Sequence, residues 1–257
     1  MVDVVMKKKY IKKQFIVLIV VSILCVALYF LLVPYYRVDS RISNIKNFSK
    51  KSGITPLGWI KVQGTNIDYP IVYYYDVDDI GDPTYNIAWN FSNQKKLASR
   101  TVVLSHNMKN VSSNPIIGDK NHERFEQLMA YIYYDFVKEN KYIQYTVDGK
   151  DYLYKIYGIS FQLENDIELG NIKKDKIDDY IKFTKNNSYF DFDVNVNKND
   201  KLITLITCTR FFGDSDYSFV VDARKVRKNE QIKNYTVKEK KNYKKIKKIL
   251  KGDDKNE

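Results

Sequence analysis

The pattern of hydrophobic and polar positions divides the chain into an apolar N-terminal stretch, an alternating middle region and a lysine-rich end. Residues 15–33 are apolar except for Ser22 and Tyr29. A helix of this length spans roughly 28 Å, close to the ~30 Å hydrocarbon core of a bilayer. Lysines crowd its N-terminal side, and such flanks stay in the cytoplasm. We therefore expect a basic cytoplasmic segment at 1–14, a transmembrane anchor at 15–33 and export of the rest.

A cleaved signal peptide is the alternative interpretation of this stretch. The apolar run is longer than the ~7–15 residues usual for a signal peptide, and "LLVPYYRVD" has no small-x-small cleavage site. A lipoprotein attached at Cys25 is disfavoured because Leu24 stands where a small residue is expected. The uncleaved anchor is the better interpretation.

The middle of the chain changes from helical spacing to the alternation typical of strands. Ile42, Ile45 and Phe48 recur at helical spacing up to Gly53, which predicts a helical linker at 34–53. The expected strands are "GWIKV", "IDYPIVYY", "RTVVLSHN", "YIQYTV", "DYLYKIYGISF", "KLITLITCT" and "YSFVVDARKV". The turns "QGTN" and Asp148-Gly149 predict hairpins.

Two further segments of the middle region predict short helices, "FEQLMAYIYYDFVKEN" at 125–140 and "KIDDYIKFTKNN" at 176–187. Several short strands broken by one or two helices are typical of a closed or nearly closed β-barrel. We therefore expect a mainly β fold, with one domain at 54–227.

The last segment, 228–257, is a lysine-rich tail. Tyr243, Ile246, Ile249 and Leu250 have a spacing compatible with an amphipathic helix. Such a basic helix would contact an anionic membrane or cell-wall polymer. A solvated, partly disordered tail is the other interpretation, and the sequence leaves both open.

Composition and charge narrow the function classes. The chain has 257 residues, is 44% hydrophobic and carries a formal charge of +12. This length is sufficient for one sizeable core. Much of the positive excess lies in the first thirteen residues and beyond Lys225, so the middle is closer to balance. Basicity of this kind often indicates nucleic-acid binding, but the predicted membrane segment argues against a nucleic-acid partner.

Cysteine usage points to one unusual residue. The chain has two cysteines, and Cys25 lies inside the predicted membrane span. Exported proteins with several cysteines usually pair them. Here Cys208 has no possible partner within the exported part, because Cys25 lies in the predicted membrane span. A leftover cysteine indicates a reactive thiol or an intermolecular bridge. A buried cysteine that acts as a small hydrophobe is the alternative.

The two histidines suggest a partner for that thiol. His106 ends the strand "TVVLSH" just as Cys208 ends "LITLITC". If these strands are neighbours, both side chains emerge at the same rim of the barrel, as a nucleophile and its base require. His122 lies in the polar segment "DKNHERF", where we expect an ordinary surface or capping residue.

These residues resemble a known family. "TLITC" matches the T-L-x-T-C signature of sortases, the membrane-anchored cysteine transpeptidases of Gram-positive bacteria, and "SHNMKN" resembles the class B version of their histidine motif. The opening "GWIKVQGTNIDYPIV" is similar as well. The resemblance covers roughly Arg41 to Arg227 and includes the N-terminal anchor.

The resemblance implies an eight-stranded sortase barrel with short flanking helices. It implies that Cys208 attacks an NPxT-type sorting signal and forms a thioester, with His106 as general acid and base. Thr207, Asn107 and Ser218 would bind the substrate. The partners would be surface proteins with this C-terminal signal, and peptidoglycan or its lipid-linked precursor as the acceptor amine. No metal or organic cofactor is expected.

The chain departs from the family at one position. Sortases carry an arginine on the strand after the cysteine, and alignment by eye places Ser218 there. Arg224 lies six residues further on, about 20 Å away along a strand. Arg210 is nearer, in the loop "TRFFGDSD", and is the candidate replacement. A serine hydroxyl provides one neutral hydrogen bond instead of a charged, forked one.

Three functions therefore follow from the sequence. The leading hypothesis is a class B sortase-like transpeptidase. The second is a catalytically weak or inactive sortase fold that binds sorting signals or wall components. The third is a membrane-tethered basic scaffold whose tail docks on anionic polymers.

Overall fold

The N-terminal helix forms a unit of its own. The computed structural model describes residues 2–32, 35–76, 86–107, 123–213 and 216–252. Its contacts divide the chain into one unit of residues 1–37 with 231–234, and a second of 38–230 with 235–257. The first unit contains α1 (Val2–Leu32). By length and composition, its window Lys12–Tyr29 is able to cross a membrane, a property that signal sequences share.

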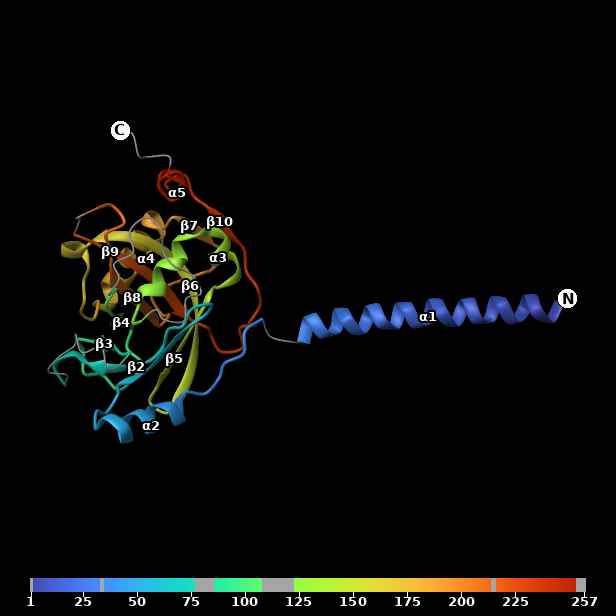
Figure 1. Ribbon diagram of the computed structural model, residues 1–257, viewed down its shortest axis with the longest axis horizontal. Helices are drawn as coiled ribbons and strands as arrows, with labels where there is room; N and C mark the ends of the chain where they lie inside the picture. The colour runs from blue at the N-terminus through green and yellow to red at the C-terminus, as the bar shows by residue number, and fades with distance from the viewer. Residues whose placement is uncertain (1, 33–34, 77–85, 108–122, 214–215, 253–257) are drawn as a thin grey trace. The chain divides into compact units, whose positions relative to one another are not determined.

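Eight strands of the second unit close into a barrel, as predicted (Figure 1). Neighbours around it run in the order β1-β2-β3-β4-β8-β9-β6-β5. Strands β2 and β3 are parallel, as are β4 and β8, and the other neighbouring pairs are antiparallel. The strands are β1 (Gly58–Val62), β2 (Asp68–Tyr73), β3 (Ala88–Asn90), β4 (Arg100–Leu104), β5 (Tyr142–Val147), β6 (Lys150–Leu163), β8 (Leu202–Cys208) and β9 (Tyr217–Lys225).

Both hairpins predicted from the sequence are present. β1 and β2 pair antiparallel, with Gly58 opposite Ile71. β5 and β6 are joined by Asp148 and Gly149, whose φ angles of 53° and 65° are both positive. A two-residue turn with positive φ at both positions matches the twist of the strands, which is why Asp-Gly is a strong hairpin signal.

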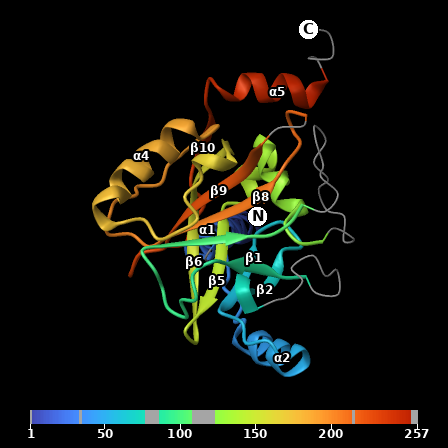
Figure 2. The ribbon, with the colours of Figure 1, turned by 90° about the vertical axis from the view of Figure 1, so that its left-hand side faces the viewer.

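The helices lie around the outside of the barrel (Figure 2). α2 and α5 lie at opposite ends of the second unit in both ribbon views. The predicted linker helix is present as α2, and Gly53 ends it with a φ of 75°, donating its N–H to the Ser49 carbonyl. The helices are α2 (Ile42–Ser52), α3 (Tyr134–Glu139), α4 (Ile177–Asn187) and α5 (Tyr243–Lys251), with short 3₁₀ turns η1 (Tyr74–Asp76), η2 (Glu126–Ile132), η3 (Glu164–Asp166) and η4 (Lys174–Lys176).

The single helix predicted at 125–140 is wrong. The segment forms η2 and then α3, separated by Tyr133 in an extended conformation. Every residue of η2 is buried, including its polar ones. The side-chain Oε1 of Gln127 accepts a hydrogen bond from the backbone N–H of Asn66 at 2.8 Å. Because the turn is enclosed on all sides, tertiary contacts override the amphipathic pattern.

Two short strands outside the barrel were not predicted. β7 (Phe190–Phe192) and β10 (Val237–Glu239) form a separate two-stranded antiparallel sheet. In α5, Tyr243 and Ile246 are buried, and the Tyr243 ring lies 4.7 Å from that of Phe190. The segment interpreted as a basic tail therefore contributes a strand and a helix that pack on the second unit. The interpretation as a solvated tail is wrong for residues 237–251, because Val237, Tyr243 and Ile246 are buried.

Candidate active site

The ends of two neighbouring parallel strands place Cys208 and His106 at the same rim of the barrel. β4 pairs with β8 so that Leu104 lies opposite Ile206, and the two side chains follow at matching positions. The backbone N–H of Ser105 donates to the Ile206 carbonyl at 3.3 Å, which continues the pairing past the end of β4. The topology thus provides the arrangement that a nucleophile and its base require.

Cys208 and His106 line one pocket of about 200 Å³. A pocket with apolar walls and a few polar groups is the usual form of a small binding site. Polar groups gather beside the thiol, and the apolar side chains form the rest of the wall. The lining residues are Trp89, Leu104, Ser105, His106, Glu164, Ile167, Leu169, Ile206, Thr207, Cys208 and Ser218.

Cys208 is a free cysteine and is exposed as a residue, although its sulfur is partly buried. Burial of the sulfur, and then the negative charge of Glu164, raise the pKa of the Cys208 thiol above its ordinary value of 9.0. The thiol is therefore largely protonated at neutral pH. Cys25, the other free thiol, lies in α1, so both cysteines remain unbridged.

The His106 imidazole is partly buried. Its ring packs edge-on against that of Trp89, with centroids 4.8 Å apart. Burial, and then the positive charge of Arg124, lower the pKa of His106 below its ordinary value of 6.5. At neutral pH the imidazole is neutral and able to accept a proton. The resting site therefore holds a neutral thiol and a neutral base.

Ser218 lies directly opposite Cys208 across the β8–β9 pair. Ser218 therefore lies at the rim of the barrel beside Cys208, at the start of β9. Arg224 pairs with Leu202, at the far end of β9. Arg210 is exposed in the segment after β8 and is not among the described residues that line the pocket.

Two polar side chains join the strand ends at the site. The Thr207 hydroxyl donates to the Ser105 carbonyl at 2.9 Å, so this side chain ties β8 to β4. The Asn107 amide donates to the Cys208 carbonyl at 3.3 Å, while its buried Oδ1 accepts no hydrogen bond from the residues that the structure describes. A buried acceptor without a donor carries a free-energy cost, and in a binding site it is available to a ligand.

Sequence reasoning did not identify Glu164 and Trp89. Glu164 is the first residue after β6, and the Ser218 hydroxyl donates to its Oε1 at 3.4 Å. Trp89 comes from β3, a strand too short to show alternation. No local sequence pattern identifies either residue, because each lies near Cys208 only once the strands have paired to form the barrel.

A buried polar network lies on the same strands, deeper in the barrel. Arg100 donates from Nε to the Thr204 hydroxyl at 2.9 Å, and its guanidinium carbon lies 4.3 Å from the centre of the Tyr180 ring. Thr204 donates to Asp222 at 2.6 Å. Burial raises the pKa of Asp222, and the charge of Arg100 opposes this shift. These contacts satisfy polar groups that would be costly if left unpaired.

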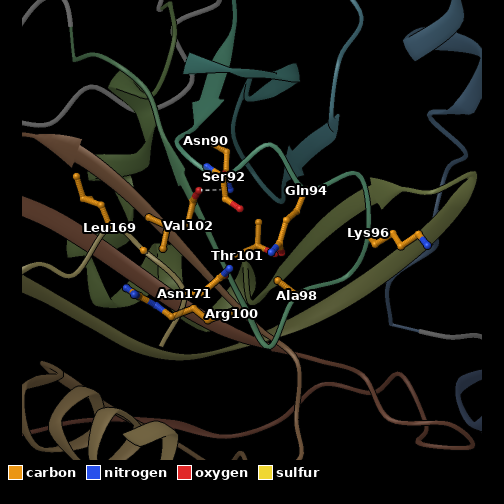
Figure 3. Close-up of a pocket in the computed structure, with 11 residues that line it drawn as sticks. Asn90, Ser92, Gln94, Lys96, Ala98, Arg100, Thr101, Val102, Leu169 and Asn171 are labelled. Carbon is orange, nitrogen blue, oxygen red and sulfur yellow. Dashed lines mark hydrogen bonds between the residues drawn. The ribbon is translucent and has the colours of Figure 1, made fainter. Parts of the chain in front are cut away.

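Arg100 also supports the wall of the active-site pocket. Its Nη1 donates to the Glu168 carbonyl at 2.6 Å, between the two wall residues Ile167 and Leu169. Leu169 also lines a second, polar pocket of about 10 Å³ (Figure 3). In that pocket the Asn90 amide donates to the Val102 carbonyl at 2.7 Å. This volume holds about one water molecule, so the second pocket is too small for a substrate.

Within the described part of the chain, no three His, Cys, Asp or Glu side chains are grouped as a metal site requires.

Comparisons with known proteins agree with this geometry. The family model described as a sortase domain matches residues 60–226. Sortase B of Listeria monocytogenes is 26% identical over 170 residues, which cover 59% of this chain and 62% of that protein. The match thus spans less than two thirds of the length of this relative.

Solved structures extend the comparison to the fold. Clostridium perfringens sortase B matches with a TM-score of 0.56 and 26% identity, over 71% of this chain and 99% of that one. A Staphylococcus aureus sortase B–substrate complex matches with a TM-score of 0.56 and 20% identity, over 72% of this chain and 85% of that one. At that lower identity, the second likeness shows the fold alone.

Proposed function

Because this chain belongs to the sortase family, in its class B, we propose that it is a membrane-anchored cysteine transpeptidase that attaches surface proteins to the cell wall. The observation that carries the proposal is the placement of His106 and Cys208 at matching strand ends in one pocket. Fold likeness alone does not establish an activity, whereas this pair provides a nucleophile and a base.

The first half of the reaction forms a thioester. His106 takes the proton of the Cys208 thiol, and the sulfur attacks the threonine carbonyl of an NPxT-type sorting signal. The peptide C–N bond then breaks, and the leaving amine takes the proton back from His106. A neutral imidazole and a neutral thiol are suitable starting states for this transfer.

The second half transfers the protein to an amine of peptidoglycan or of its lipid-linked precursor. The amine attacks the thioester carbonyl and loses a proton to His106. The C–S bond breaks, and the departing sulfur recovers that proton. The product is an amide that fixes the surface protein to the wall, and the enzyme returns to its resting state.

Asn107 and Thr207 bind or position the sorting signal in this proposal. Among the described residues no donor reaches the buried Oδ1 of Asn107, so in this proposal it accepts an N–H from the peptide backbone. Thr207 lines the pocket beside the nucleophile, and its hydroxyl holds the strand ends together. Arg100 supports the apolar wall against which the peptide packs.

The location follows from the N-terminal helix. We place the anchor at 15–33 with residues 1–14 in the cytoplasm, and the catalytic domain at 54–227 outside the cell. The lysine-rich flank before the apolar stretch supports this orientation. An external domain would meet both exported proteins and wall precursors.

The weak point of the proposed site is charge stabilisation. Loss of an oxyanion donor typically costs roughly 100- to 1,000-fold in rate, and Ser218 replaces the arginine that the family carries. Arg210 replaces that arginine if the segment after β8 moves toward the pocket. If it does not, and no other positive charge reaches the site, the protein is a sorting-signal binder.

Mass spectrometry of the full chain in detergent tests the proposed function. The protein would be incubated with NPxT-type peptides, with and without an amine acceptor. We expect a mass increase on Cys208 without acceptor, and a transferred peptide with it. His106→Gln should reduce both signals strongly, because the thiol loses its base.

The second cysteine provides a matched control. Cys208→Ala should abolish the adduct, whereas Cys25→Ala should leave it unchanged, because Cys25 lies in α1. If Cys208 reacts with a general thiol reagent but is not acylated by any peptide in the series, the transpeptidase proposal is wrong and the binding function replaces it.

A further inference from the structure

Glu164 occupies a fixed place at the rim of the active-site pocket. β6 and β9 pair antiparallel, with Gln162 opposite Ser218, so the first residue after β6 lies beside the start of β9. The backbone N–H of Glu164 donates to the Asp216 carbonyl at 2.8 Å. The Ser218 hydroxyl donates to the Glu164 carboxylate at 3.4 Å, and Ser218 lies opposite Cys208.

The Glu164 carboxylate has no ion-pair partner among the described residues. It lines the pocket next to the apolar side chains of Ile167 and Ile206. Its negative charge acts on Cys208 and raises the pKa of the thiol. A negative charge therefore lies beside Ser218, the residue that aligns with the family's arginine.

Other charged or titratable groups lie on the elements that meet at this rim. His106 follows β4, and Arg124 acts on it. Arg210 lies two residues after Cys208, and Asp216 precedes Tyr217 at the start of β9. Among these groups, Glu164 both lines the pocket and raises the pKa of the Cys208 thiol, in addition to the effect of burial.

We propose that Glu164 binds a primary ammonium group carried by the substrate, and that this group supplies the positive charge that other sortases carry as an arginine. The inference rests on the proposed function, because it names the class of substrate for that site. Two sources have the required chemistry, the acceptor amine and a lysine side chain of the sorting peptide. An ammonium ion with three donors fits a carboxylate and a neighbouring serine hydroxyl.

Binding of the cation changes the nucleophile. An ammonium beside Glu164 offsets the negative charge that disfavours the thiolate, so the thiolate becomes easier to form. By linkage, deprotonation of Cys208 also strengthens binding of the ammonium. The site would thus become reactive when a suitable substrate is present.

The rate of Cys208 alkylation tests this coupling without requiring transpeptidation. The full chain in detergent, with Cys25→Ala as background, would be treated with iodoacetamide over a range of pH. The probe is butylammonium chloride, compared with sodium chloride at equal ionic strength. We expect the ammonium to lower the apparent thiol pKa by about half a unit, which is about threefold in rate below that pKa.

Two variants separate the effect of Glu164 from general electrostatics. Glu164→Gln should start with a lower thiol pKa and show no response to butylammonium. Asp166→Asn removes a nearby exposed acid of the same 3₁₀ turn that does not line the pocket, and should respond as the parent protein does. Equal responses in parent and Glu164→Gln, or no response in either, would overturn the proposal.

Binding measurements distinguish the two sources. In Cys208→Ala, the dissociation constants would be compared for N-acetylated NPKT and NPQT peptides, and for triglycine and N-acetyl-triglycine. Glu164→Gln should weaken the charged member of one pair by about threefold or more and leave its neutral partner unchanged. Equal weakening of charged and neutral members in both pairs would instead show a structural role and contradict the inference.

These outcomes are distinguishable from failure of the proposed function. A protein that responds to butylammonium but is not acylated retains the ammonium site and loses the transpeptidase proposal. A protein that is acylated but shows no Glu164-dependent response retains the transpeptidase function and loses the ammonium site.

Discussion

One glutamate lies beside each end of β9, and the two glutamates have opposite environments. At one end, Glu230 accepts hydrogen bonds from Nη2 of Arg224 and Nζ of Lys155, each at 2.7 Å. At the other end, Glu164 accepts one long hydrogen bond from the Ser218 hydroxyl. Both ends belong to the same strand, yet only the first provides a carboxylate with cationic partners among the described residues.

The difference separates a structural charge from a functional one. Arg224 is almost fully buried and also donates to the Asn195 carbonyl at 3.0 Å, so it cannot move to the active site. This rules out Arg224 as a replacement for the family arginine. A carboxylate enclosed by cations stabilises the fold, whereas one that lines a pocket without a cation can act on the nucleophile and on a ligand.

The largest expected effect is on stability, at the end of β9 where Glu230 is paired with Arg224 and Lys155. Arg224→Met should lower the free energy of unfolding by about 3 kcal/mol, because it leaves Lys155 as the remaining cationic partner of Glu230 and empties a buried site. Urea unfolding of the full chain in detergent would measure the change. Lys228→Met, at an exposed neighbouring position, is the control and should have little effect. Equal losses of unfolding free energy in Arg224→Met and Lys228→Met would show that the Arg224–Glu230 pair has no special role in stability.

The second largest effect is expected from acid, which should reduce the contribution of Glu230 to the stability of the fold. Although burial acts in the opposite direction, the hydrogen bonds from Arg224 and Lys155 hold the pKa of Glu230 well below its ordinary value of 4.5. Its contribution to stability is therefore present above about pH 4.5 and is lost as the pH falls toward the folded-state pKa. Glu230→Gln should flatten the dependence of the unfolding free energy on pH in this acid range. An unchanged slope would contradict the assignment.

A smaller effect, on the reactivity of Cys208, is expected when Glu164 is given a cationic partner like those of Glu230. Ser218→Arg places a cation beside Glu164 and opposite Cys208. We expect a lower pKa of the Cys208 thiol and about threefold faster alkylation at neutral pH, the result of about half a pKa unit. The variant should also lose its response to butylammonium. Ser218→Met, a neutral change that also lengthens the side chain, should do neither.

The smallest effect is expected from Ser218→Ala. The hydrogen bond that it removes is long, at 3.4 Å, and its acceptor is exposed. The free energy of unfolding should change by less than about 0.5 kcal/mol, as thermal unfolding of the full chain would show. A loss as large as that of Arg224→Met would mean that both ends of β9 are structural.

The sequence by itself determined the barrel, the apolar N-terminal helix and the common rim of the two candidate catalytic side chains. Alternating strands, an Asp-Gly turn and a long apolar stretch are local patterns, so they can be recognised without knowing which strands pair. The endings "TVVLSH" and "LITLITC" predict a common rim for His106 and Cys208, because parallel neighbours end at the same edge.

Only the tertiary structure decided what surrounds those side chains. Glu164 and Ser218 are 54 residues apart and meet because β6 pairs with β9. The helix expected at 125–140 breaks at Tyr133 because the segment is buried on all sides, and part of the expected tail packs through Tyr243 on the domain. Burial and long-range pairing set the charge balance at the thiol, and neither can be read from residues that are neighbours in the chain.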